Sequence, residues 1–210
     1  MPTLRRVDDS NRAVHRYLMP DDECYFLHEY TARAGYAHSA VNQFIHNLKK
    51  SPTKRLEPQY QHKLQAIERA IAEFKAVFAS SSNLYAECTF VPMPPSQAPG
   101  AAEYDDRMWQ VVQGICKEAN ADARELISQT NSYDPAHLAN TYNRIKPKEL
   151  QALYRLDANP PKPTVLLFDD VLTTGTHFRA AKSAIVTNYH EVRVVGLFIA
   201  RRVFPDQTES

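Results

Sequence analysis

The sequence lacks the motifs that mark several large classes of protein. Its three cysteines form no CxxC pair and its eight histidines form no HExxH motif, which argues against a disulfide framework and a transition-metal site. Neither GxGxxG nor GxxxxGK[ST] occurs, so the dinucleotide-binding and P-loop patterns are excluded. The absence of GxSxG likewise argues against a serine hydrolase.

Charge and hydropathy exclude further functions. The 25 basic side chains nearly balance the 24 acidic ones, so no overall charge attracts nucleic acid or an acidic membrane. No apolar run reaches the ~18 residues of a transmembrane helix, and the polar start MPTLRRVDDSNR does not resemble a secretory signal. We therefore expect a cytoplasmic protein of one domain, or one domain with an appendage, that binds neither membrane nor nucleic acid directly.

Residues 1–83 predict a mostly helical region. Apolar side chains recur at helical spacing over residues 40–47 and again from Pro58 to about Phe78. The buried face of the longer helix is expected to carry Leu64, Ile67, Ile71, Phe74 and Phe78. The run KKSPTKR, residues 49–55, is a loop by composition, and its charges fit a solvated surface better than a nucleic-acid contact.

Residues 84–210 predict an α/β domain. Strands are expected at residues 85–91, 125–130, 165–168 and 192–200, and helices at residues 105–119 and 178–188. The last two strands are continuously apolar and a helix joins them. This pattern predicts a largely parallel twisted sheet with flanking helices on both faces.

The stretch VLLFDDVLTTGTHF, residues 165–178, predicts a ligand site, because open α/β sheets bind ligands where a parallel strand ends. Gly175 permits a turn with positive φ, so the amides of the turn and of the next helix can converge on an anion. Asp169 and Asp170 repel a bare phosphate, but they suit a ligand that also brings hydroxyl groups or Mg²⁺. A sugar phosphate satisfies both requirements.

This stretch resembles the ribose 5-phosphate-binding signature of type I phosphoribosyltransferases, in which an apolar strand precedes two acids, two spacers and a Thr-Thr-Gly loop. The resemblance covers about residues 85–200 and is closest to the ComF-type, competence-associated branch. It implies a type I phosphoribosyltransferase-like domain over residues 84–210. The helical region, residues 1–83, would then be a candidate hood over the site.

The resemblance also implies a set of site residues. The ribose 5-phosphate site would consist of Asp169, Asp170, Thr173, Thr174, Gly175, Thr176 and His177. The two aspartates would hold the cofactor Mg²⁺, directly or through water. The diphosphate site would consist of Pro94, Pro95, Ser96, Arg107 and Arg144. Asp169, Asp170 and Arg107 would serve catalysis, with Arg107 and Mg²⁺ stabilising the departing diphosphate.

Simpler roles remain open for some of these residues. Arg107 can instead cap a solvated helix face, and Arg144 can be a solvated loop residue. His177 stands where many family members have serine or threonine; it either donates to phosphate, with a charge that varies near neutral pH, or caps the helix. Thr173 stands where purine-salvage relatives often have an aspartate, a proposed general base, so no acceptor base is indicated.

Two functions use these residues, and a third, a pure interaction protein with the fold as a scaffold, does not require them. The first is a phosphoribosyltransferase, active alone or as a homodimer, that transfers the phosphoribosyl group of phosphoribosyl diphosphate to an unidentified nitrogen nucleophile. The second is a non-catalytic sensor of phosphoribosyl diphosphate or a nucleotide, linked to DNA uptake or defence. The aromatic segment of residues 24–36 favours the second function if it covers the site, whereas core packing is its simpler role.

Overall fold

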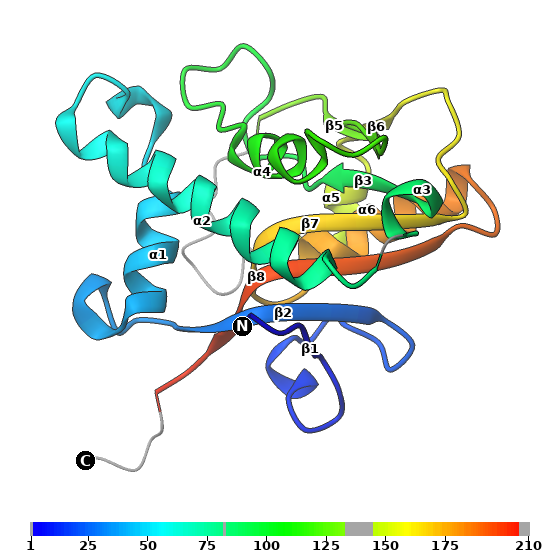
Figure 1. The fold of residues 1–210 in the computed structure, drawn as a ribbon. Helices are drawn as coiled ribbons and strands as arrows, with labels where there is room; N and C mark the ends of the chain where they lie inside the picture. Colours follow the sequence, from blue (N-terminus) through cyan, green and yellow to red (C-terminus); the bar gives the residue numbers. More distant parts are fainter. Residues whose placement is uncertain (1, 82, 133–144, 206–210) are drawn as a thin grey trace.

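A six-stranded sheet organises the chain (Figure 1). The structure is a computed structural model that describes residues 2–81, 83–132 and 145–205. The strand order is β1-β2-β8-β7-β3-β4, and only the pair of β1 with β2 is antiparallel. The six strands are β1 (Arg5–Arg6), β2 (Glu23–Thr31), β3 (Cys88–Pro92), β4 (Asp122–Ala123), β7 (Thr164–Leu172) and β8 (Arg193–Val203).

Helices cover both faces of this sheet. The main helices are α1 (Ala40–Leu48), α2 (Gln61–Phe78), α3 (Leu84–Glu87), α4 (Arg107–Cys116), α5 (Pro147–Gln151) and α6 (Thr176–Asn188). Short 3₁₀ turns lie at Arg12–Val14, Tyr36–His38, Pro52–Lys54 and Pro58–Tyr60. The fold is therefore the expected α/β arrangement, with a mostly parallel sheet and flanking helices.

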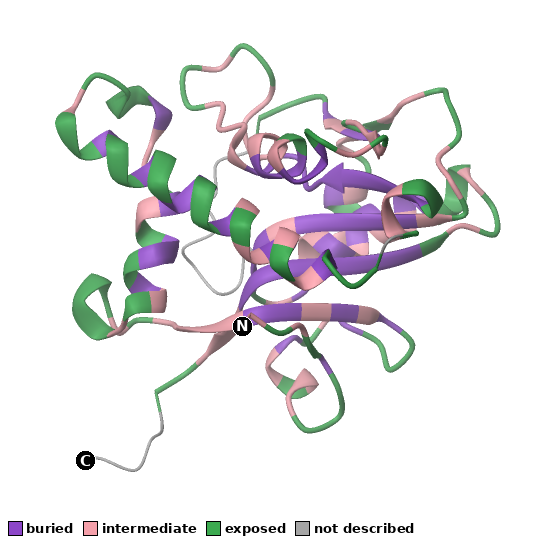
Figure 2. Cartoon of the chain, in the orientation of Figure 1, coloured by how far each residue is buried: buried purple, intermediate pink, exposed green. Residues whose placement is uncertain are grey.

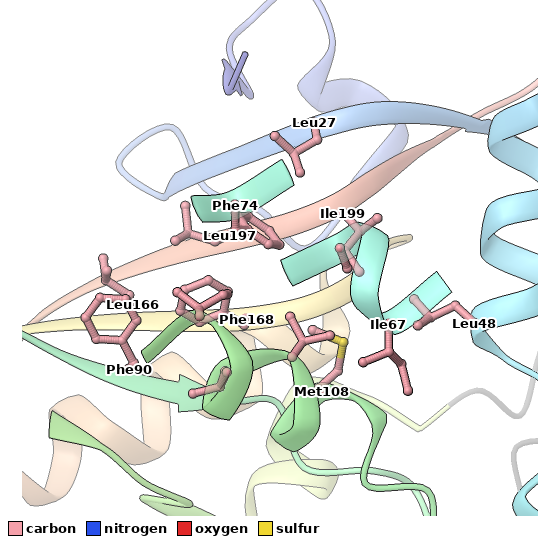
Figure 3. Close-up of a cluster of buried hydrophobic side chains, with 14 of the residues drawn as sticks. Leu27, Leu48, Ile67, Phe74, Phe90, Met108, Leu166, Phe168, Leu197 and Ile199 are labelled. Atoms are coloured by element: carbon pink, nitrogen blue, oxygen red, sulfur yellow. The ribbon is translucent and has the colours of Figure 1, made fainter. Parts of the chain in front are cut away.

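The two faces of the sheet contribute to separate hydrophobic clusters. On β7, Leu166 and Phe168 pack with α1, α2 and α4, whereas Val165 and Leu167 pack with α6. This alternation is the period of two that a strand imposes on its side chains. Figure 2 shows the central strands buried, and Figure 3 shows Phe74 of α2 beside Phe168 of β7 in the first cluster.

Local interactions place the start of α1 near the carboxyl end of β2. Ser39 caps the helix by accepting a hydrogen bond from the Asn42 amide at 3.0 Å. The fully buried Asn42 side chain donates to the carbonyls of Thr31 and Gly35, both at 2.9 Å. Because Thr31 ends β2, these hydrogen bonds tie α1 to the sheet.

The N-terminal region is less helical than expected. Residues 36–78 are mostly helical, but β2 belongs to the central sheet and pairs in parallel with β8. Cys24 and Phe26 from the aromatic segment are buried in the core, so this part of the segment is a strand and not a hood. The alternating apolar residues fit a strand, which pairs with β8 and buries one set of side chains in the core.

Two expected strands also differ from the observed elements. Residues 85–87 form part of α3, and the Tyr85 ring stacks on the Phe90 ring with the two centroids 5.3 Å apart. The segment 125–130 contains β5 (Ile127–Gln129), which pairs antiparallel with β6 (Tyr154–Leu156) in a separate two-stranded sheet. Ile127 is buried in the cluster that contains α6, and the place beside β3 belongs to β4.

Helix α2 buries most of the predicted side chains but not Leu64. Leu64 is 48% exposed, whereas its neighbour Lys63 is 1% exposed. Burial of Ile67, Phe74 and Phe78 agrees with the prediction. The described residues contain no helix that is both long and apolar enough to cross a membrane.

Replacing Phe74 with alanine should strongly destabilise the protein. Phe74 is fully buried and its ring lies 5.2 Å from that of Phe168, so Phe74→Ala should lower the free energy of unfolding by about 3–5 kcal/mol. Leu64→Ala on the exposed side of the same helix is the control, and its cost should stay below about 1 kcal/mol. Urea denaturation measures both; similar costs would contradict this orientation of α2.

Candidate functional site

A cleft of about 270 Å³ lies where β7 and β3 end. The residues predicted for the site come together in its wall: Pro94, Pro95, Ser96, Arg107, Asp169, Asp170, Thr173, Gly175, Thr176 and His177. Thr174 belongs to the same turn without lining the cleft, and Arg144 lies outside the described residues. Segments predicted separately for the sugar and diphosphate sites therefore share one cleft.

The turn between β7 and α6 has the geometry expected of an anion-binding loop. Gly175 has a φ of 83° and is the N-cap of α6. This conformation is open to glycine and strained for other residues, and it directs the first amides of the helix toward the turn. The hydroxyl groups of Thr174 and Thr176 lie 2.8 Å apart and share a hydrogen bond.

Residues near the N-terminus support this turn. The Tyr17 amide donates to the Thr174 carbonyl at 3.0 Å, and the His15 Nδ1 hydrogen-bonds the Thr173 carbonyl. A Cβ at position 175 would lie only 2.9 Å from Leu18 Cδ2, so the Leu18 side chain leaves no room for one. Sequence analysis did not identify these supporting residues, because no motif links positions 15–18 to positions 173–175.

His15 carries out this role as a neutral imidazole. Its side chain is fully buried, and burial lowers its pKa to about 4, although the hydrogen bond to Thr173 acts in the opposite direction. Since the carbonyl can only accept, Nδ1 carries the proton. The buried Nε2 has no hydrogen-bond partner among the described residues.

Asp170 is held by two cations from other parts of the chain. Its Oδ1 lies 3.0 Å from Lys49 Nζ, and its Oδ2 accepts from Arg107 Nε at 3.0 Å and also from Nη2. Burial alone would raise its pKa, but Lys49 and Arg107 outweigh burial and lower the pKa well below the usual value. Asp170 is therefore a permanent anion in this site.

Asp169 differs from its neighbour in both contacts and charge. Its Oδ1 accepts a hydrogen bond from the Asp170 amide at 2.8 Å. Burial, followed by repulsion from Asp170, raises the pKa of Asp169, and attraction to Lys49 only partly offsets this effect. The two carboxylates expected to act as a pair are thus electrostatically unequal.

Arg107 lies inside the cleft, which excludes the interpretation that it caps a solvated helix face. It donates from Nη1 to Asp105 Oδ2 at 2.7 Å as well as to Asp170. Burial acts against its charge, but Asp170 and Asp105 outweigh burial and raise its pKa. A guanidinium beside Pro95 and Ser96 is suited to phosphate oxygens.

Lys49 is a site residue that sequence analysis missed. Its position in the run KKSPTKR predicted a solvated charge, and its side chain is in fact 42% exposed. Nevertheless Lys49 lines the cleft and binds Asp170. Its local sequence carried no signal of this contact, because the two residues lie far apart along the chain.

His177 lines the cleft as the second residue of α6. Burial lowers its pKa to about 4, and attraction to Asp170 compensates only in part. Burial therefore favours a neutral His177 near neutral pH, whereas a charge that varies there was expected for a histidine bound to phosphate. A neutral imidazole can still donate one hydrogen bond to a ligand.

The described residues do not form a complete metal site. No group of three or more histidine, cysteine, aspartate or glutamate side chains suited to a metal occurs among them. Both oxygens of Asp170 already contact cations, so Asp169 is the better carboxylate for Mg²⁺. Mg²⁺ commonly combines one or two carboxylates with substrate phosphates and water, and the cleft fits this arrangement only with a phosphorylated ligand.

Comparison with known proteins adds no assignment, because no protein-family model and no curated protein matches the sequence.

The buried His15 should make the protein sensitive to acid. Between its usual pKa of 6.5 and its folded value of about 4, the unfolded state binds a proton that the folded state does not. Stability from this group is therefore lost as the pH falls through that interval. His15→Gln removes the group that titrates and keeps a donor for Thr173. The melting temperature of this variant should therefore fall less than that of wild type between pH 6.5 and 4.

Thermal unfolding followed at several pH values provides this measurement. His38→Gln, the same substitution at an exposed position, is the matched control. Equal pH dependence of His15→Gln and wild type would show that His15 is not buried in its neutral form.

Proposed function

We propose that the cleft binds phosphoribosyl diphosphate or a nucleotide that contains ribose 5-phosphate. We further propose that the protein transfers the phosphoribosyl group to a nitrogen nucleophile with release of diphosphate. One observation carries this proposal: a glycine turn at a helix N-terminus, a carboxylate and two cations surround a single cleft. A phosphate, a diol and a diphosphate are the complementary ligand groups.

The Gly175 turn suits the 5′-phosphate. The first amides of α6 have no partner within the helix, and its dipole favours negative charge at this end. The Thr176 hydroxyl and the neutral His177 line the same part of the cleft and add donors without adding charge. Support from Tyr17 and His15 holds the turn in place before the ligand arrives.

Asp169 suits the ribose hydroxyls. Its side chain lines the cleft, and its contact with the Asp170 amide occupies Oδ1. A sugar diol, or a Mg²⁺ bound to the ligand, would lower the pKa of Asp169 toward its usual range by favouring the carboxylate. Ligand binding would therefore favour the ionised form of Asp169.

The diphosphate would lie near Arg107, Pro95 and Ser96, which line the same cleft. Mg²⁺, when bound, would neutralise part of the diphosphate charge. Arg107 is held in place by Asp105 and Asp170, so its donors are oriented before the reaction begins. Such preorganised donors stabilise the charge that develops on a departing diphosphate.

A non-catalytic sensor remains the second candidate. Thr173 lines the cleft where a carboxylate base would stand in purine-salvage relatives, and its hydroxyl is a poor proton acceptor. The cations and the glycine turn would serve ligand binding equally well without chemistry. Both candidate functions require the same ligand, and they differ in whether the protein converts that ligand to products.

Binding and turnover should separate these functions. Isothermal titration of phosphoribosyl diphosphate with Mg²⁺ should show one site per chain. Diphosphate release is then measured with a panel of purine, pyrimidine and small amine acceptors. Release that depends on one acceptor identifies a transferase, and binding without release identifies a sensor. Absence of binding would reject both functions.

Two substitutions should distinguish the sugar contact from the phosphate contact. Asp169→Asn should weaken ribose 5-phosphate binding by at least about tenfold, because a charge-assisted hydrogen bond contributes ~1.5–3 kcal/mol. Inorganic phosphate should bind this variant no less tightly than wild type, because a repulsive charge is removed. Equal loss of both ligands from a folded variant would contradict the sugar-binding role of Asp169.

Gly175→Val should abolish binding of both ligands. A β-branched residue resists the φ of 83°, and its side chain would collide with Leu18. Gly35→Val is the matched control, because Gly35 has a φ of 80° and open space around it, away from the cleft. Gly35→Val should retain phosphate binding in the same titration. If Gly35→Val also loses phosphate binding, the loss in Gly175→Val reflects impaired folding.

A further inference from the structure

A buried lysine lies beneath the cleft. Lys63 of α2 is 1% exposed, and its ammonium group makes three hydrogen bonds. It donates to the Leu48 carbonyl at 3.0 Å, the Lys50 carbonyl at 2.7 Å and Asp105 Oδ2 at 2.6 Å. All three donors of the ammonium group are therefore in use, as a buried charge requires.

The first two hydrogen bonds fix the backbone around Lys49. Leu48 and Lys50 flank Lys49 in sequence, at the C-terminal end of α1, where helix carbonyls need partners from outside the helix. One buried ammonium group therefore holds the carbonyls on both sides of Lys49. This arrangement directs the long, partly exposed Lys49 side chain over the cleft to Asp170.

The third hydrogen bond reaches the other cation of the cleft. Asp105 accepts from Lys63 and also from Arg107, and Arg107 in turn donates to Asp170. The interactions close into a ring that runs from Lys63 through Asp105, Arg107, Asp170 and Lys49, and through the α1 backbone back to Lys63. Within this ring three cations face two carboxylates, which leaves an excess of positive charge.

Lys49 is well placed to change partners. It lines the main cleft and also an adjoining recess that contains Pro95, Ser96 and Arg107. Its side chain is far more exposed than that of Asp170, so it can turn toward a ligand without leaving the site. A lysine has three rotatable donors on a flexible stem, whereas the guanidinium of Arg107 is fixed by two carboxylates.

We propose that Lys49 is a second cation of the diphosphate site and that Lys63 positions both Lys49 and Arg107 for this role. The inference rests on the proposed function, because it assumes that a diphosphate enters the cleft. The Lys49 ammonium then exchanges one oxygen of Asp170 for a diphosphate oxygen, while Arg107 stays on Asp170 and presents its outer donors. Lys63 never contacts the ligand and acts only through the groups that it holds.

Lys49→Met and Lys50→Met test the first part of the proposal. Both variants lose one positive charge, from adjacent positions, but the Lys50 side chain hydrogen-bonds Asn47 and does not line the cleft. Titration with Mg²⁺ and inorganic diphosphate should show a loss of at least about tenfold for Lys49→Met, the effect of one lost charge-assisted hydrogen bond. The diphosphate affinity of Lys50→Met should remain within about twofold of wild type, because salt screens the effect of a charge that does not contact the ligand.

Ribose 5-phosphate is titrated into the same variants as a second probe. It should bind Lys49→Met about as tightly as wild type, because it brings no diphosphate. Equal diphosphate affinities for Lys49→Met and Lys50→Met would overturn the inference and leave the proposed function intact. If wild type binds neither diphosphate nor phosphoribosyl diphosphate, the proposed function and this inference both fail.

Lys63→Met tests the positioning role. It should weaken diphosphate binding while ribose 5-phosphate binding is retained, and adding Lys49→Met to it should cost less than Lys49→Met costs in wild type. Lys75→Met, the same substitution on the exposed part of α2, is the control. A full Lys49→Met effect in both backgrounds would show that Lys63 is only structural.

If Lys63→Met does not fold, Asp105→Asn replaces it, because this change weakens the link between Lys63 and Arg107 and leaves the α1 carbonyls bound. It should reduce diphosphate affinity and spare ribose 5-phosphate affinity. An unchanged diphosphate affinity would overturn the positioning role.

Discussion

The buried carboxylate of Asp170 is the constraint on which the rest of the cleft depends. A charge at the buried end of a strand requires partners, and Asp170 finds them in Lys49 and Arg107. These residues come from the end of α1 and the start of α4, so one carboxylate brings three distant segments together. The same contacts leave Asp169 as the carboxylate that a ligand can use. The two acids therefore differ in role: Asp170 holds distant segments together, whereas Asp169 lines the cleft without such an ion pair among the described residues.

The N-terminal part of the chain contributes directly to the candidate site. It supplies β2 to the sheet, His15 and Tyr17 to the underside of the turn, and Lys49 to the cleft wall. A site built from both ends of the chain can couple ligand binding to the packing of α1 and α2. The glycine turn and the cations Lys49 and Arg107 thereby line one cleft.

Sequence analysis identified the features that depend on local pattern. The apolar run before Asp169, the turn at Gly175 and the helix after it are encoded in adjacent residues, and all three are present. It missed features that arise from tertiary contact, such as Lys49 on Asp170 and His15 beneath Thr173.

Helix α2 illustrates this limit of local pattern. The helical spacing of apolar residues predicted a buried Leu64. Lys63 is buried instead, and its ammonium group donates to three acceptors in the fold. The pairing of β5 with β6 was missed for the same reason, since strand partners are set by packing and not by the segment alone.

We propose above all that phosphoribosyl diphosphate binds between the Gly175 turn and the Lys49–Arg107 pair. Amide chemical shifts of the isotope-labelled protein, recorded during titration with this ligand and Mg²⁺, test the claim residue by residue. We expect large shifts for Gly175, Thr176 and His177, together with changes at Lys49 and Arg107. Shifts that cluster elsewhere, or no shifts at millimolar ligand, would contradict it.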